Sequence, residues 1–183
     1  MNLANILTIS RLLLLPIMIG LLHISGFWPV IITLLLYIIG SLTDFADGYV
    51  ARKYNQITPF GTFLDPIADK VYVAALFFML IAHQHIIGLW VVLPILIISR
   101  ELLISGLREY LGPHNITFPV TTLAKWKTTS QLLATGFLIP APYIAYTYEI
   151  GLALLTVCTT LTVITGWKYM KVGMTEMKNL TKT

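Results

Sequence analysis

The hydrophobic residues of this chain gather in six stretches, separated by short connections that carry polar residues, glycine or proline. The stretches cover residues 8–22, 28–50, 63–82, 86–107, 129–146 and 150–167. Most of them approach the ~20 apolar residues that an α-helix needs to cross a membrane. The pattern therefore predicts an all-α, polytopic membrane protein with six transmembrane helices. Pro16 and Pro94 fall inside predicted spans, where we expect each to kink its helix.

The two ends of the chain are more polar than the stretches between them. Residues 1–10 are mildly amphipathic, so we expect a short N-terminal helix that lies along the membrane surface. Asn5, Thr8 and Arg11 recur at i, i+3 and i+6, which predicts one polar stripe on that segment. Residues 171–183 carry lysines and show no apolar face, so they predict a solvated tail.

Composition and charge support this organisation. Of the 183 residues, 57% are hydrophobic, which predicts a single membrane domain over residues 1–183. With the N-terminus in the cytoplasm, all 12 Lys and Arg residues fall on the inner side and the outer connections carry none. This bias predicts a multi-pass protein with six spans and both termini on the cytoplasmic side. The basic residues form no run interleaved with aromatic residues, which argues against nucleic-acid binding. The single cysteine, Cys158, excludes a disulfide within the chain.

Half of the 8 acidic residues lie at the junction of the second and third stretches: Asp44, Asp47, Asp65 and Asp69. An acid at the centre of a spanning helix costs about 3 kcal/mol, so four uncompensated acids would cost on the order of 10 kcal/mol. Their spacings of three and four residues place each pair on one face of its own helix. Carboxylates facing each other across one hairpin predict a site for two hard divalent cations, open to the cytoplasm.

Small residues and an arginine follow the first acidic pair. Gly48 and Ala51 leave the helix surface beside the carboxylates nearly bare, which favours close approach of a nucleotide. Arg52 is able to donate two hydrogen bonds to a phosphate. The alternative is that the small residues serve helix packing and that the arginine contacts lipid headgroups.

The complete spacing from Asp44 to Asp69, D-x2-D-G-x2-A-R-x8-G-x3-D-x3-D, resembles the signature of the CDP-alcohol phosphotransferase family. The resemblance implies a homodimeric membrane enzyme that uses two Mg²⁺ or Mn²⁺ ions. It implies that Asp44, Asp47, Asp65 and Asp69 form the metal site, and that Asp69 is also the general base. It further implies that CDP-diacylglycerol binds at Asn5, Asp47, Gly48, Ala51, Arg52, Thr58 and Gly61.

A second group of charges lies near the cytoplasmic end of the fourth stretch and the start of the fifth. Glu101, Ser105 and Arg108 share a helix face, so Glu101 is expected to pair with Arg108 or another base. Lys125 and Lys127 have no acid nearby in the sequence. Basic residues gathered at one end of a helix bundle are able to hold a phosphate, although each lysine alone is as well explained by lipid headgroups.

The segments GTFLDPIADK, SRELLISGLRE and LAKWKTT resemble the branch of the family whose acceptor is sn-glycerol 3-phosphate. The expected function is metal-dependent phosphatidyl transfer from CDP-diacylglycerol to that acceptor. The acceptor phosphate is expected at Thr8, Arg11, Arg100, Arg108, Lys125 and Lys127. Inositol phosphate, serine or phosphatidylglycerol as acceptor is one alternative, and a divalent-cation transporter is another.

The histidines, His23, His83, His85 and His114, are expected at the surface.

Overall fold

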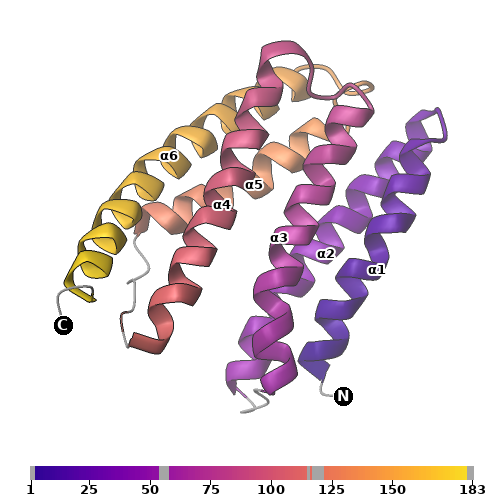
Figure 1. The fold of residues 1–183 in the computed structure, drawn as a ribbon. Coiled ribbons are helices and arrows are strands. Elements are labelled where there is room, and N and C mark those ends of the chain that lie inside the picture. The colour runs from indigo at the N-terminus through magenta and orange to yellow at the C-terminus, as the bar shows by residue number, and fades with distance from the viewer. Residues whose placement is uncertain (1–2, 54–57, 115, 117–121, 181–183) are drawn as a thin grey trace. The chain divides into compact units, whose positions relative to one another are not determined.

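The computed structural model describes residues 3–53, 58–114, 116 and 122–180, without the side chains of residues 3–5, 44–53, 59, 60 and 62. Figure 1 shows its α-helices: α1 (Leu3–Leu22), α2 (Phe27–Lys53), α3 (Pro59–Ala82), α4 (Val92–Leu111), α5 (Thr122–Leu138) and α6 (Thr147–Leu180). Two short 3-10 helices, η1 (Gly88–Val91) and η2 (Gly112–His114), flank α4. The described residues contain no strand, which confirms the all-α prediction.

The chain divides into two compact units, so the prediction of a single domain stays a prediction. Unit 1 consists of Met1–Ile87 and Thr135–Gly151, and unit 2 consists of Gly88–Ala134 and Leu152–Thr183. In unit 1, α1 packs against both α2 and α3 (Figure 1). The buried residues of α1 recur in steps of three and four, which is the spacing of one helix face: Thr8, Arg11, Leu15, Met18 and Leu22.

In unit 2, α4 and α6 meet at two glycines of α6 that are seven residues apart. A Cβ atom added at Gly166 would lie 2.7 Å from Cγ of Arg100, and one added at Gly173 would lie 2.4 Å from a Cδ atom of Leu107. Arg100 and Leu107 are also seven residues apart, so the two helices keep the same register over two turns. Glycine lets the helix backbone of α6 serve as a packing surface for these α4 side chains.

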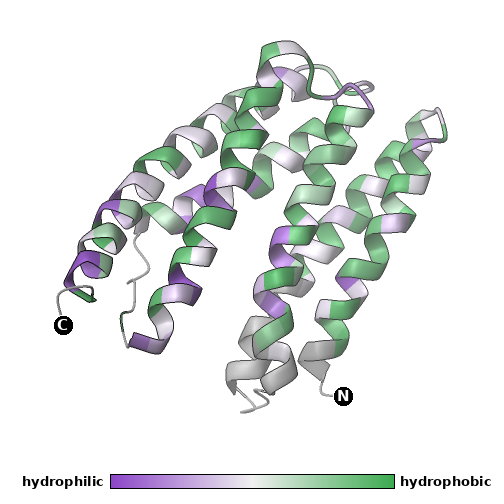
Figure 2. Ribbon diagram, in the orientation of Figure 1, coloured by the Kyte–Doolittle hydropathy of each residue, from purple (hydrophilic) through white to green (hydrophobic). Residues whose placement is uncertain are grey.

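The surface of the described helices is apolar in many places. Gly88–His114 and Thr147–Leu180 are long and apolar enough to cross a membrane, and shorter apolar helices cover Ile6–Leu22 and Phe27–Thr43. Figure 2 shows hydrophobic residues along α4 and the first half of α6, with hydrophilic residues toward their C-terminal ends. Large apolar side chains such as Phe63 are mostly exposed, at 66%. Exposed apolar surfaces of this extent are typical of membrane proteins and rare on soluble ones.

Two predictions about the first four helices need correction. α1 is one continuous helix, so no separate surface helix precedes the first apolar stretch. Pro16 lies inside α1 as expected. Pro94 lies in the first turn of α4, directly after η1, and therefore does not interrupt a helix. Its missing N–H costs nothing there, because the first N–H groups of a helix have no partner within it.

The last two helices also differ from the prediction. α5 ends at Leu138 rather than near Tyr146, and Pro140 and Pro142 lie in the turns that follow. α6 continues to Leu180, so the prediction of a solvated tail from residue 171 is wrong for the described part of that segment. The cause is packing: Met170, Met177 and Leu180 lie against a buried cluster of Ile104, Leu107, Leu111 and Tyr169.

One histidine is not at the surface as predicted. His85 is 6% exposed, and its Nδ1 lies 2.9 Å from the carbonyl oxygen of Leu138 at the end of α5. Burial lowers the pKa of His85 below its ordinary value of 6.5. His83 has a lowered pKa for the same reason, with a smaller contribution from His23, whose ring centroid is 4.6 Å away. The folded protein therefore favours the neutral form of the His85 side chain.

The apolar residues at the end of α6 give the first prediction. Met177→Ala combined with Leu180→Ala removes side chains that cover the cluster, so we expect a loss of roughly 1–3 kcal/mol, less than for fully buried positions. The matched control is Met174→Ala, because Met174 is 51% exposed on the same helix. Thermal unfolding in detergent measures both, and equal melting temperatures would refute the packing role of the α6 end.

The lowered pKa of His85 gives a second prediction. Below pH 6.5 the unfolded chain takes up a proton that the folded chain resists, so the contribution of His85 to stability should be unchanged above pH 7 and should fall as the pH falls to 5. His85→Gln should reduce this pH dependence, leaving the part that comes from His83. The measurement is the melting temperature as a function of pH, and an unchanged slope in the variant would contradict the assignment.

Candidate active site

Two carboxylates of α3 are held by polar side chains of α1. Oγ1 of Thr8 donates a hydrogen bond to Oδ1 of Asp65 over 2.9 Å. Nη1 of Arg11 lies 3.1 Å from Oδ1 of Asp69, and the side chains are 5% and 56% exposed, respectively. Because Asp65 and Asp69 are four residues apart, their carboxylates lie one helical turn apart on α3. The predicted polar stripe of α1 thus faces α3, with Asn5 outside the described side chains.

The position of Arg11 depends on close packing of the three helices of unit 1. A Cβ atom added at Gly40 of α2 would lie 2.7 Å from the hydroxyl oxygen of Tyr72 on α3 and 3.8 Å from Cγ of Arg11. A larger residue at this position would displace one of these neighbours. Gly40 therefore lets α1, α2 and α3 approach each other beside the ion pair between Arg11 and Asp69.

The start of α3 is fixed by a capping residue that the sequence analysis had placed at the nucleotide. Oγ1 of Thr58 accepts a hydrogen bond from the backbone N–H of Gly61 over 3.0 Å, and Pro59 follows in the first helical turn. Serine or threonine before proline at a helix start is a common N-terminal signal. Gly61 is buried. The two residues thus set where α3 begins, at Pro59, six residues before Asp65.

The remaining residues of the acidic motif lie on the C-terminal part of α2, where the structure describes the helix but not the side chains. They are Asp44, Asp47, Gly48, Ala51 and Arg52. Their spacing on a helix is therefore as predicted, and their contacts stay predictions. The described donors fit a hard divalent cation, because carboxylate oxygens are its preferred ligands and both α3 acids are exposed. Oδ2 of Asp65 makes no hydrogen bond to any described residue.

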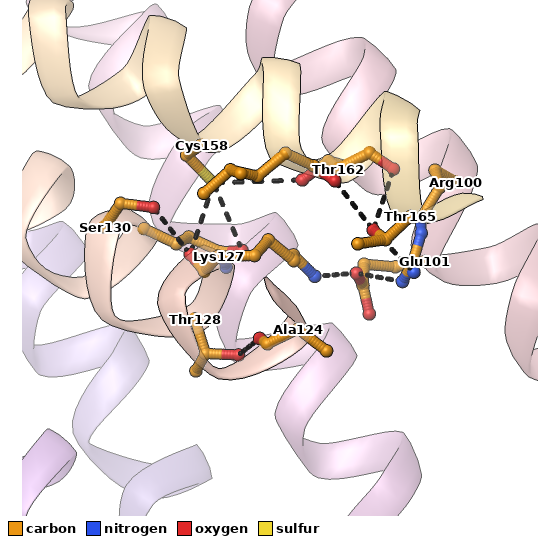
Figure 3. Close-up of polar contacts among 11 residues, drawn as sticks. Arg100, Glu101, Ala124, Lys127, Thr128, Ser130, Cys158, Thr162 and Thr165 are labelled. Carbon is orange, nitrogen blue, oxygen red and sulfur yellow. Dashed lines mark hydrogen bonds and ion pairs between the residues drawn. The ribbon is translucent and has the colours of Figure 1, made fainter. Parts of the chain in front are cut away.

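In unit 2, one acid joins α4 to α5 (Figure 3). Oε1 of Glu101 pairs with Nζ of Lys127 and lies 3.1 Å from Nη1 of Arg100. Nη2 of Arg100 also donates to Oγ1 of Thr165 on α6 over 3.1 Å. Lys127 is 6% exposed. Glu101 therefore joins α4 to α5, and its neighbour Arg100 joins α4 to α6. The expectation that Glu101 pairs with Arg108 or another base is confirmed, with Lys127 and Arg100 as the bases.

The other two basic residues of the predicted acceptor site have no such partner. Arg108 and Lys125 are exposed, and among the residues that the structure describes neither has a carboxylate within ion-pair distance. The guanidinium carbon of Arg108 lies 5.5 Å from the centroid of the Tyr169 ring. The six predicted acceptor residues thus divide into four that are bonded to other side chains and two that are available to an anion.

The sequence analysis missed three residues of α6 that contact the arginines: Thr165, Gly166 and Tyr169. Thr165 is 2% exposed and Tyr169 is 6% exposed. Thr165 and Gly166 belong to a stretch that was interpreted as an apolar span only, because threonine and glycine are common in membrane helices for packing, and Tyr169 lies just beyond that stretch. The signal was the spacing of i, i+1 and i+4, which places the three residues on one face of the helix.

Comparison with known proteins identifies the family. The model of the CDP-alcohol phosphatidyltransferase family matches residues 1–167, so the chain belongs to this family. A protein of Rickettsia bellii is 41% identical over 174 residues, 93% of this chain and 94% of the relative. A protein of Haemophilus influenzae is 38% identical over 179 residues, 94% of this chain and 93% of the relative. Both relatives are named CDP-diacylglycerol–glycerol-3-phosphate 3-phosphatidyltransferase.

The central position of Glu101 gives a third prediction. Glu101→Gln leaves the charges of Lys127 and Arg100 without an acid inside the helix bundle, so we expect a loss of stability of about 3 kcal/mol. The matched control is Glu109→Gln on the same helix, because Glu109 is exposed and should change stability little. Thermal unfolding in detergent compares the two. A melting temperature for Glu101→Gln equal to that of the control would show that the ion pair does not hold the helices.

Proposed function

We propose that this protein transfers the phosphatidyl group of CDP-diacylglycerol to sn-glycerol 3-phosphate, giving phosphatidylglycerophosphate and CMP. Family membership and relatives with that printed activity, which match nearly their whole length, support the reaction. The observation that carries it in the structure is the pair of α3 carboxylates. Each is held through Oδ1 by α1, and both stay accessible to a ligand.

The donor site consists of the acidic motif and its neighbours. Asp44, Asp47 and Asp65, with Asp69, would hold two Mg²⁺ or Mn²⁺ ions, which neutralise the pyrophosphate and stabilise the leaving CMP. The residues assigned to CDP-diacylglycerol are Asn5, Asp47, Gly48, Ala51, Arg52, Thr58 and Gly61. Arg52 supplies two donors to a phosphate, and the glycines leave room for the nucleotide. Thr8 fixes the carboxylate of Asp65 by its hydrogen bond.

Asp69 is the general base. It takes the proton from the 1-hydroxyl of the acceptor, and the hydroxyl oxygen forms a bond to the phosphorus that carries diacylglycerol. The bond from that phosphorus to the oxygen of CMP breaks, and CMP leaves with the electron pair. Arg11 lies 3.1 Å from Asp69 and restricts the orientation of its carboxylate. A base held in one geometry loses less entropy on the way to the transition state.

Arg108 and Lys125 bind the phosphate of the acceptor. Both are exposed, and no described carboxylate neutralises them. Arg100 and Lys127 are already paired with Glu101, and Arg11 is paired with Asp69, so these three act mainly by fixing the helices. A charge-assisted hydrogen bond to a phosphate is stronger than one between neutral groups, and two cations therefore suffice to favour a phosphorylated acceptor.

We place the protein in the inner membrane of a bacterium, with six spans, both termini in the cytoplasm and the active site open to that side. The distribution of the 12 Lys and Arg residues and the α-helices of the described chain support this arrangement. CDP-diacylglycerol, which is itself a membrane lipid, then enters the site from the inner leaflet. We also expect a homodimer, as the family resemblance implies.

The test of the function is an assay with purified protein in liposomes that contain labelled CDP-diacylglycerol. sn-Glycerol 3-phosphate should give labelled phosphatidylglycerophosphate, with release of CMP, only when Mg²⁺ or Mn²⁺ is present. Inositol phosphate, serine and phosphatidylglycerol are offered in parallel, and preference for one of them would replace the proposed acceptor. Flux of Mn²⁺ into the liposomes without any CMP release would instead support a transporter.

Asp69→Asn gives the fourth prediction. The amide cannot accept the proton of the acceptor, so we expect kcat to fall by about 100-fold or more while the lipid donor still binds. Binding of CDP-diacylglycerol is measured separately by titration. Glu109→Gln serves as the control for a lost carboxylate outside the site. Loss of donor binding with an intact rate per bound substrate would contradict the role of Asp69 as base.

A further inference from the structure

The side chain of Arg100 lies against α6 (Figure 3). Its Nη2 donates to Oγ1 of Thr165 over 3.1 Å, and its stem lies so close to Gly166 that an added Cβ would come within 2.7 Å of Cγ. The guanidinium carbon of Arg100 lies 5.6 Å from the ring centroid of Tyr169, one turn further along α6. We call these three residues of α6, Thr165, Gly166 and Tyr169, the α6 cradle.

The ring of Tyr169 is shared by two arginines. Arg100 lies at 5.6 Å and Arg108 at 5.5 Å from its centroid, both within the range of a cation–π interaction. Tyr169 is 6% exposed, so its ring is fixed by the surrounding core. Arg100 is restrained further by Glu101 and Thr165. Arg108 is exposed, and the ring is its only charged or aromatic contact among the described residues.

This arrangement brings two positive charges to one aromatic ring. The two guanidinium groups repel each other, and only Arg100 is compensated by an acid. The ring offsets part of the repulsion and limits the positions that Arg108 is able to take. A long side chain restrained in this way loses less conformational freedom when an anion binds, and therefore binds it more tightly.

We propose that Tyr169 is a positioning residue that holds Arg108 for the phosphate monoester of the acceptor, with Thr165 and Gly166 fixing Arg100 behind it. This inference rests on the proposed function, since it takes Arg108 as a ligand of the acceptor phosphate. It assigns a role in substrate selection to α6, the helix whose sequence looks like a plain membrane span. Tyr169 itself touches neither substrate nor the reacting atoms.

The experiment compares Tyr169→Leu with Tyr169→Phe in the liposome assay. Tyr169→Leu removes the ring, so the KM for sn-glycerol 3-phosphate should rise roughly three- to tenfold, while kcat and the KM for CDP-diacylglycerol stay within about twofold. Tyr169→Phe keeps the ring and should behave like the parent protein. Equal loss in both variants, or a rise in the KM of the lipid donor, would overturn the positioning role.

A double variant tests whether Tyr169 acts through Arg108. If it does, Tyr169→Leu should raise the acceptor KM no further in an Arg108→Ala background, because the restrained group is already absent. Additive effects of the two substitutions would overturn the inference. If Tyr169→Leu does not fold, Thr165→Val is used instead, with an expected rise of about twofold. Its matched control is Thr160→Val, which loses the same kind of hydrogen bond to the preceding turn and touches no arginine.

Binding of inorganic phosphate separates this inference from the proposed function. Calorimetry on detergent-solubilised protein without lipid donor should show weaker phosphate binding for Tyr169→Leu than for Tyr169→Phe and the parent. If the parent forms no phosphatidylglycerophosphate but phosphate binding follows this order, the proposed function fails and the role of Tyr169 stands. If the parent is active and all three proteins bind phosphate equally, the function stands and the inference fails.

Arg108→Ala gives the fifth prediction, and the role of Tyr169 depends on its outcome. Loss of a charge-assisted hydrogen bond should raise the KM for sn-glycerol 3-phosphate roughly tenfold or more, with little change in the KM for the lipid. The control is Lys171→Ala, which removes an exposed cation of α6 that has no assigned role. An unchanged acceptor KM in Arg108→Ala would move the phosphate site away from Arg108 and overturn the role of Tyr169 with it.

Discussion

The need to match every charge buried among apolar helices shapes both units of this protein. Arg11 is 4% exposed and Lys127 is 6% exposed, and each contacts a carboxylate from another helix, because a buried cation without an acid is costly. Asp65 and Asp69 are held by α1, and Glu101 is held by α5 and by its own neighbour Arg100. These contacts decide which faces of the helices meet, because a helix rotated by one residue would separate the partners.

The sequence predicted well those features that depend on one helix alone. The spacing of Thr8 and Arg11 placed them on one face, and the spacing of Asp65 and Asp69 did the same on α3; the structure joins the two pairs. The all-α class followed from the apolar stretches. The partner of Glu101 did not follow, because the nearest base on its own helix face, Arg108, competes with a lysine 26 residues away that only tertiary packing brings close.

The contacts of α6 with the arginines of α4 could not be predicted from the sequence for a related reason. Its threonines and glycines are residues that membrane helices use for packing, so nothing in its composition marks Thr165 or Gly166. Their importance comes from what lies opposite them, a long arginine side chain that needs a gap in the helix surface. The helix also runs past its apolar stretch to Leu180, since Met177 and Leu180 find apolar partners on α4 and its neighbours. Both facts depend on contacts between distant segments.

Charge pairing also narrows the set of residues that are able to bind substrate. A cation that already has a carboxylate must give up that partner before it binds a phosphate, and the exchange leaves an unpaired acid among apolar helices. Binding a phosphate through Arg11, Arg100 or Lys127 would therefore cost free energy, because an ion pair must break, whereas Arg108 and Lys125 have no such pair to break. The sequence analysis named all five cations as candidate ligands of the acceptor phosphate, with Arg108 and Lys125 as the first choice. The structure separates them by whether an acid is present, and substrate specificity then depends on how firmly the unpaired cations are held in place.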